Sequence, residues 1–149
     1  MGRNLVIKPG GKFSCSVSFN ADKQQVVVIK DRATGQELYN SGISNPRQQW
    51  SFDNATGTTA KILILGVFFK NAPSGHELWR PSAERILFNN YEPLRRFRNI
   101  VLGTEDSGDQ DFNDTTVIAT WENHVVPLGL VAPDWDTDSI FQFEQLNPF

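Results

Sequence analysis

The stretch "NIVLGTEDSGDQDFNDTTVIATWE", residues 99–122, holds two strand-like segments on either side of an acidic loop. Both "NIVLGTE" and "TTVIATWE" are rich in apolar and β-branched residues, which favours strands. Five carboxylates fall between Glu105 and Asp114. Like charges so close together repel each other, and a folded chain seldom crowds them beside its own core. The loop is therefore expected to hold a positively charged partner.

The rest of the chain repeats the same alternation of strand and turn signals. Polar turns rich in Gly, Pro and Asn separate the strand-like segments, of which the clearest are "KFSCSVSFN" (12–20), "QQVVVIKD" (24–31) and "TTAKILILGVFFK" (58–70). No segment has a convincing amphipathic-helix pattern. Residues 71–98 are predicted to be irregular, with one or two short strands and at most a helical turn near "SAERI". The pattern predicts an all-β protein with an antiparallel β-sandwich fold.

Composition narrows the class of protein. The 149 residues suffice for one domain with a sizeable core, and the net charge of −3 with a single short basic block, "RRFR" (95–98), argues against a nucleic-acid partner. The single cysteine, Cys15, rules out intrachain disulfides and is predicted to be a buried structural thiol. No apolar run suits a signal peptide or a membrane span. The protein is therefore expected to be cytoplasmic, or released without a signal peptide.

The acidic loop has the composition of a calcium site. Calcium takes about six to eight oxygen ligands, and no His or Cys lies near the loop to favour zinc or copper. Ser107-Gly108 lets the chain fold back on itself, and five acids exceed what one calcium ion needs, which favours two adjacent ions. Counted from Asp109, the loop is not an EF-hand, because the required Gly falls on Asp114 and the required Glu falls on Thr120. The alternative is a solvated acidic turn, but Phe112 in its middle indicates a loop packed against the protein.

The sequence resembles a known family, the small calcium-mediated fucose- and mannose-binding lectins first recognised in bacteria. The stretch "GTEDSGDQDFNDTTVIATW" (103–121) matches the family's acidic run and following strand in order and without gaps, and "KFSCSVSFNADKQQVVVIK" (12–30) matches its N-terminal strand, Asn-containing loop and next strand. The resemblance implies a β-sandwich of about nine strands that binds two neighbouring calcium ions. It also implies that sugar hydroxyls coordinate both ions directly.

The resemblance also implies particular site residues. The implied calcium ligands are Asn20, Glu105, Asp109, Asp111, Asn113 and Asp114. The implied sugar-binding residues are Ala21, Asp22, Asp106, Asp109, Asp111 and Asn113. Ala21, Asp22 and Lys23 match the short loop that tunes sugar preference in the family, and they differ from the Ser-Ser-Gly version associated with fucose. The expected partners are therefore fucose- or mannose-type glycans.

The chain departs from the family at its C-terminal end. Family members usually end W-P-L-G, with the terminal carboxylate entering a neighbouring subunit's calcium site, whereas here Trp121 is followed by a further stretch to Phe149. We therefore divide the chain into a lectin sandwich, residues 1–122, and a C-terminal extension, residues 123–149, which is either an edge strand or an arm contacting another subunit. Either an acid of "DWDTD" (134–138) replaces the missing carboxylate or the site is closed within one chain. The alternative role of these charges is to protect an edge strand. A homodimer or tetramer is expected.

The expected function is calcium-dependent sugar binding without catalysis. A glycosidase needs two separated carboxylates flanking a cleft, and neither His76 nor His124 lies in a nucleophile motif. Trp79 is the tryptophan expected to be best placed for stacking on a sugar ring. The alternative function is a calcium-stabilised structural or adhesion module that binds no sugar.

Overall fold

A computed structural model describes residues 2–20, 23–43, 46–54, 57–70, 79–92, 94, 96–106, 111–122 and 135–138. Within these ranges the chain forms eleven β-strands and no helix. The strands are β1 (Gly2–Ile7), β2 (Lys12–Phe19), β3 (Gln24–Asp31), β4 (Glu37–Asn40), β5 (Gln48–Asp53), β6 (Lys61–Lys70), β7 (Arg80–Pro81), β8 (Ala83–Glu92), β9 (Phe97–Glu105), β10 (Thr115–Glu122) and β11 (Trp135–Asp138). No helix in these ranges is long and apolar enough to cross a membrane.

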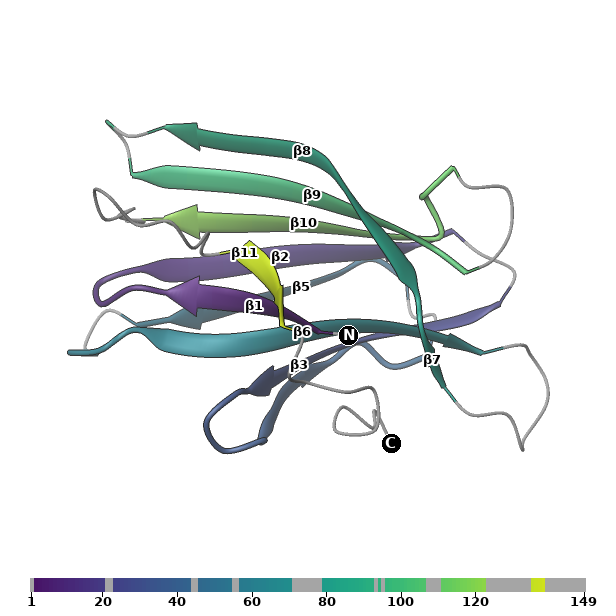
Figure 1. The fold of residues 1–149 in the computed structure, drawn as a ribbon, viewed down its shortest axis with the longest axis horizontal. Coiled ribbons are helices and arrows are strands. Elements are labelled where there is room, and N and C mark those ends of the chain that lie inside the picture. Colours follow the sequence, from purple (N-terminus) through teal and green to yellow (C-terminus); the bar gives the residue numbers. More distant parts are fainter. Residues whose placement is uncertain are drawn as a thin grey trace.

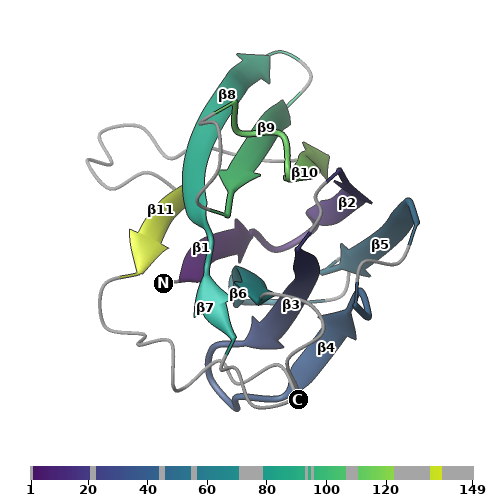
Figure 2. The same ribbon diagram turned by 90° about the vertical axis from the view of Figure 1, so that its right-hand side faces the viewer.

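The strands form two antiparallel sheets. The first sheet has the order β11-β1-β6-β3-β4, with β7 also paired to β6, and the second has the order β5-β2-β10-β9-β8. Figure 1 shows the two sheets in the broad view, and Figure 2, turned by 90°, shows them as two facing layers. The predicted all-β, antiparallel β-sandwich is therefore confirmed. The described strands outnumber the nine implied by the resemblance because of the short strands β7 and β11.

The main core lies between the two sheets. The alternation of β2 turns Phe13, Cys15 and Val17 inward, and they meet the inward side chains of β1, β3, β6, β9 and β10. Phe13 packs edge-on against Trp121, with 4.9 Å between ring centroids. Cys15 is buried, and this burial raises the pKa of its thiol to about 12, which confirms the predicted structural role.

A second apolar cluster covers the outer face of the first sheet. It contains buried residues of β3 and β6 together with one tryptophan: Val26, Val28, Ile64, Phe68 and Trp79. Because β3 and β6 are buried on both faces, their sequences are continuous apolar runs without alternation. Trp79 is only 9% exposed, with the Lys70 ammonium 4.9 Å from its ring centroid. Little of its ring surface is left for a sugar, so the expectation that Trp79 contacts ligand is not supported.

Strand β8 corrects the prediction for residues 71–98. Ala83–Glu92 is a ten-residue strand where irregular chain and a helical turn were expected, and residues 71–78 lie outside the described part. Among the described strands it lies at the edge of its sheet and pairs with β9, and its register shifts between Ile86 and Phe88. Phe88 is 52% exposed. An exposed edge strand with a bulge lacks the period-two pattern by which strands are recognised.

The chain changes sheets immediately before β8. β7 pairs with β6 of the first sheet, and the Ser82 N–H donates to the Val67 carbonyl at 3.0 Å, whereas Ala83 pairs with Glu105 of the second sheet. Figure 1 shows β7 and β8 as one continuous ribbon running from one layer to the other. An ion pair between Arg3 of β1 and Glu84 of β8 also links the sheets. Both connections involve the start of β8, where Ala83 and Glu84 pair with the last two residues of β9.

The described part of the extension is a strand. β11 pairs antiparallel with β1, so that Trp135 lies opposite Leu5 and Asp138 opposite Gly2. This strand forms one edge of the first sheet. Residues 123–134 and 139–149 lie outside the described part of the chain.

Candidate metal centre

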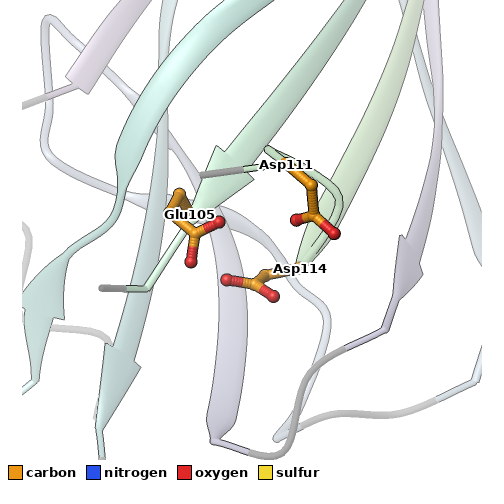
Figure 3. Close-up of side chains that lie close together, drawn as sticks. All are labelled: Glu105, Asp111 and Asp114. Atoms are coloured by element: carbon orange, nitrogen blue, oxygen red, sulfur yellow. The ribbon is translucent and has the colours of Figure 1, made fainter. Parts of the chain in front are cut away.

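The acidic loop joins the last residue of β9 to the first residue of β10. Glu105 ends β9, and Asp114 immediately precedes Thr115, the first residue of β10. Figure 3 shows the side chains of Glu105, Asp111 and Asp114 pointing toward one another. One carboxylate oxygen of each lies within 4.8 Å of those of the other two. Such a spacing places three oxygen ligands around a common centre.

Backbone hydrogen bonds fix the C-terminal side of the loop. The Asp114 N–H donates to the Thr104 carbonyl at 3.1 Å, which continues the β9–β10 pairing into the loop. The Asn20 N–H donates to the Asp114 carbonyl at 2.7 Å. This second bond brings Asn20, which directly follows β2, to the acidic centre.

The loop is packed against the second sheet, as the presence of Phe112 predicted. Phe112 has a φ of 56° and is half-buried, and the Arg85 guanidinium carbon lies 4.5 Å from its ring centroid. The Phe112 carbonyl passes so close to Gly103 that a Cβ on this glycine would lie 2.2 Å from the carbonyl oxygen. Only a residue without a side chain fits between β9 and the loop at this point.

Asp106 connects the acidic residues to β3. Its N–H donates to Asp114 Oδ2 at 2.7 Å and to Glu105 Oε1 at 3.1 Å. Its own carboxylate accepts a hydrogen bond from Gln25 Nε2 at 3.0 Å, and its carbonyl accepts one from Lys23 Nζ at 3.0 Å. Both the main chain and the side chain of Asp106 are thus held in place.

The acidic centre concentrates negative charge that is removed from water. Glu105, Asp106 and Asp114 are 5%, 7% and 8% exposed. The pKa of Asp114 is raised from 3.8 to about 7, chiefly because the group is buried and also because the carboxyl groups of Glu105 and Asp106 lie beside it. The hydrogen bond from the Asp106 N–H opposes this rise. A divalent cation among these oxygens would reverse the effect by stabilising the ionised form.

The implied site residues fall into three groups. Glu105, Asp111 and Asp114 are brought together, and Asp106 lies buried beside them. Asn20 and Asn113 are exposed. Asn20 is next to the centre through its backbone hydrogen bond to Asp114, and Asn113 directly precedes Asp114 in the sequence. The rest, Ala21, Asp22 and Asp109, lie outside the described residues. In the extension, Asp136 and Asp138 lie opposite Asn4 and Gly2 in the β1–β11 pairing.

Sequence reasoning missed two residues beneath the loop. Gln25 and Thr115 are both fully buried and hydrogen-bond to each other, with Thr115 Oγ1 donating to Gln25 Oε1 at 3.2 Å. The signal that was available is the position of Gln25, which shares the inward face of β3 with the apolar residues Val27 and Ile29. A fully buried amide at such a position requires hydrogen-bonding partners.

Comparisons with known proteins agree with this fold. A comparison with curated protein sequences finds no match. Three similar solved structures are the C-terminal domain of the BC2L-C lectin from Burkholderia cenocepacia (19% identity, TM-score 0.55, 87% of this chain and 100% of that chain), the Chromobacterium violaceum lectin CV2L in complex with α-methyl-fucoside (20%, 0.51, 86% and 96%) and a Ralstonia solanacearum high-affinity mannose-binding lectin (17%, 0.53, 86% and 96%). At these identities the likeness shows the fold alone.

Family membership rests on a comparison with protein-family models. The model of fucose-binding lectin II (PA-IIL) matches residues 5–123. This range includes the whole acidic loop and both sheets, apart from β11 and the first three residues of β1. The match covers well over half of the chain. The chain therefore belongs to the fucose-binding lectin II family.

Proposed function

We propose that this protein is a lectin that binds sugars through calcium ions held by the loop between β9 and β10. The observation that carries the proposal is the convergence of the Glu105, Asp111 and Asp114 carboxylates at one end of the sandwich. The donors are all oxygens, which suits a hard cation such as calcium. The full proposed ligand set, for two ions, is Asn20, Glu105, Asp109, Asp111, Asn113 and Asp114.

The chain's own residues prepare this centre for a cation. The Asp106 N–H holds Asp114 Oδ2 and Glu105 Oε1 within hydrogen-bonding distance of one backbone group, which fixes the relative positions of the two carboxylates. Burial of Asp114 removes competing water and favours its neutral form when no cation is present. Calcium binding therefore displaces any proton held by the centre and compensates its charge.

Bound calcium supplies coordination positions that sugar hydroxyls can fill in place of water. The carboxylates around the ions accept hydrogen bonds from the same hydroxyls, and such charge-assisted bonds are stronger than neutral ones. We assign this contact to Asp106, Asp109, Asp111 and Asn113, together with Ala21 and Asp22 of the preceding loop. We propose fucose- or mannose-type sugars because one similar lectin was solved with α-methyl-fucoside and another is described as mannose-binding.

Sugar binding of this kind requires no catalysis. The described acids of the centre lie in one loop and converge, whereas a glycosidase holds two carboxylates apart on either side of a scissile bond. We propose that the protein is not an enzyme and acts as a homodimer or tetramer. Linked sites raise avidity by roughly a hundredfold or more without any new contact.

The test is binding to a glycan array in the presence of calcium and again in the presence of a chelator. We expect fucose- or mannose-containing glycans to be bound only with calcium. Asp111→Ala is expected to abolish both calcium and glycan binding while the protein stays folded, because Asp111 is exposed. The matched control is Glu122→Ala, since Glu122 is an exposed acid at the opposite end of β10.

Two outcomes would contradict the proposal. Full glycan binding by Asp111→Ala would rule out the calcium centre as the sugar site. A large loss of stability on chelation, with no glycan bound by the wild-type protein, would instead support the structural or adhesion module.

A further inference from the structure

A buried pair of side chains lies directly beneath the proposed sugar-binding centre. Gln25 projects from the inward face of β3 and is 0% exposed, and Thr115 at the start of β10 is also 0% exposed. The Gln25 amide makes a hydrogen bond at each end: Nε2 donates to Asp106 Oδ2 at 3.0 Å, and Oε1 accepts from Thr115 Oγ1 at 3.2 Å. These two hydrogen bonds link β10 and β3 to the acidic loop.

Hydrogen-bonding chemistry allows this arrangement in one orientation only. An ionised carboxylate accepts hydrogen bonds and donates none, so the amide of Gln25 must turn its NH2 group toward Asp106. Its carbonyl then faces Thr115, whose hydroxyl is the group that donates. The Asp106 carboxylate therefore decides which way the amide faces, since a hydroxyl can either donate or accept. The bond from Thr115 anchors the amide at its carbonyl end, so that its NH2 group holds the Asp106 carboxylate in place.

The main chain of Asp106 is held by separate contacts. Its N–H bonds to the Glu105 and Asp114 carboxylates, and its carbonyl accepts from Lys23. These bonds fix where the backbone lies but leave rotation about the side-chain bonds free. The bond from Gln25 acts on the carboxylate itself, which also lies beside the Asp114 carboxyl group.

We infer that Gln25 is a positioning residue for sugar recognition: it holds the Asp106 carboxylate in the orientation that accepts a hydrogen bond from a sugar hydroxyl, with Thr115 anchoring its amide. This inference rests on the proposed function, because it assigns a role within the same site. Gln25 itself is buried and touches neither sugar nor cation. Its effect is exerted wholly through Asp106.

The first test compares Gln25→Met with Gln24→Met. Methionine matches the length of glutamine without its amide, and Gln24 is the preceding residue of β3, on the opposite face. At saturating calcium, we expect the Kd of Gln25→Met for a monosaccharide probe to rise at least about tenfold, as for loss of one hydrogen bond to a charged group, whereas Gln24→Met stays within about twofold. The calcium Kd of Gln25→Met should change by less than about threefold, because the backbone contacts of Asp106 remain. The probes are methyl α-fucoside and methyl α-mannoside, and the one that the wild-type protein binds more tightly is used throughout.

The second test uses Thr115→Val, which keeps the shape of the side chain and removes the hydroxyl that anchors the amide. We expect it to weaken sugar binding by a smaller factor than Gln25→Met, because the amide can still donate to Asp106 but is no longer held at its carbonyl end. The double variant should bind sugar no more weakly than Gln25→Met alone, since the hydroxyl acts through the amide. If Gln25→Met fails to fold, Thr115→Val alone provides the test.

The outcomes separate this inference from the proposed function. A wild-type protein that binds neither sugar probe in the presence of calcium would contradict both the proposed function and the positioning role of Gln25. A wild-type protein that binds sugar, with Gln25→Met equally tight at saturating calcium, would overturn the positioning role alone. Equal losses of calcium and sugar affinity, or independent effects of the two substitutions, would also overturn it, because they indicate general disturbance of the site.

Discussion

At the scale of single residues, the acidic centre depends on a glycine as much as on its carboxylates. Gly103 lies where the loop crosses β9, and a Cβ there would lie 2.2 Å from the Phe112 carbonyl and 2.8 Å from Leu87. Since the nearest neighbour is backbone, the loop itself would have to move. The position of Asp111 and Asp114 is thereby linked to the absence of a side chain on the preceding strand.

Gly103→Ala is therefore expected to displace the loop. We expect the free energy of unfolding to fall by about 1–3 kcal/mol, as for other overpacked sites, and calcium affinity to fall with it. Urea unfolding and calcium titration measure the two effects. Ser16→Ala, a change on the outer face of the same sheet, should alter neither, and calcium affinity unchanged in Gly103→Ala would show that the loop tolerates displacement.

Asp114 predicts a pH dependence of stability in the calcium-free protein. Its pKa is raised in the folded state from 3.8 to about 7, so between these pH values the folded protein binds more protons at this group than the unfolded chain. Its contribution to stability is therefore greatest in acid and is lost as the pH rises through about 7. Urea unfolding in chelator at pH 5 and pH 7.5 should show a larger decline with pH for the wild-type protein than for Asp114→Asn. Equal declines would contradict the assignment.

At the scale of elements, the sequence predicted strands best where at least one face is buried. The segment 12–20 alternates, and the structure forms β2 over Lys12–Phe19; the apolar run of β3 was predicted with both of its bounds, Gln24–Asp31. Strand β8 was missed because an edge strand exposes its apolar residues and carries a bulge. Gln25 was missed for a different reason: a partner 81 residues away in sequence leaves no local pattern.

The connection between sheets gives an element-scale prediction. Arg3 of β1 and Glu84 of β8 form an ion pair whose side chains are 13% and 11% exposed, and burial raises the pKa of Glu84. Glu84→Gln removes the charge that compensates Arg3, and we expect the free energy of unfolding to fall by about 2 kcal/mol or more. Urea unfolding measures the change. Glu122→Gln, at an exposed position, serves as the control, and equal stability of the two variants would show that the pair contributes little.

At the scale of the whole molecule, the β-sandwich brings together the two segments, 12–30 and 103–121, that resemble the lectin family. The chain after β2 and the loop after β9 are more than 80 residues apart in sequence, yet the Asn20 N–H bonds to the Asp114 carbonyl. The acidic run could be assigned to a cation from the sequence because its ligands are local. The layer beneath it joins β3 of one sheet, β10 of the other and Asp106 of the loop, and these bonds could be seen only in the structure.

Calcium is expected to stabilise the whole sandwich. A ligand bound only by the folded state adds about 2.7 kcal/mol at a concentration one hundred times its Kd. The Tm should therefore rise with calcium concentration and return to its starting value with chelator, as measured by differential scanning calorimetry. Asp111→Ala should show no such shift, and a wild-type Tm that does not respond to calcium would contradict the metal centre.

The single thiol of the protein gives the sandwich an internal reporter. Cys15 is the only cysteine, it lies in the core between the sheets, and its raised pKa keeps it protonated while the protein is closed. A thiol-modifying reagent can therefore react only when the layers separate far enough to admit it. The rate of modification records how often that separation occurs, without any label or substitution. Because calcium is expected to stabilise the folded sandwich, adding calcium should make such events rarer.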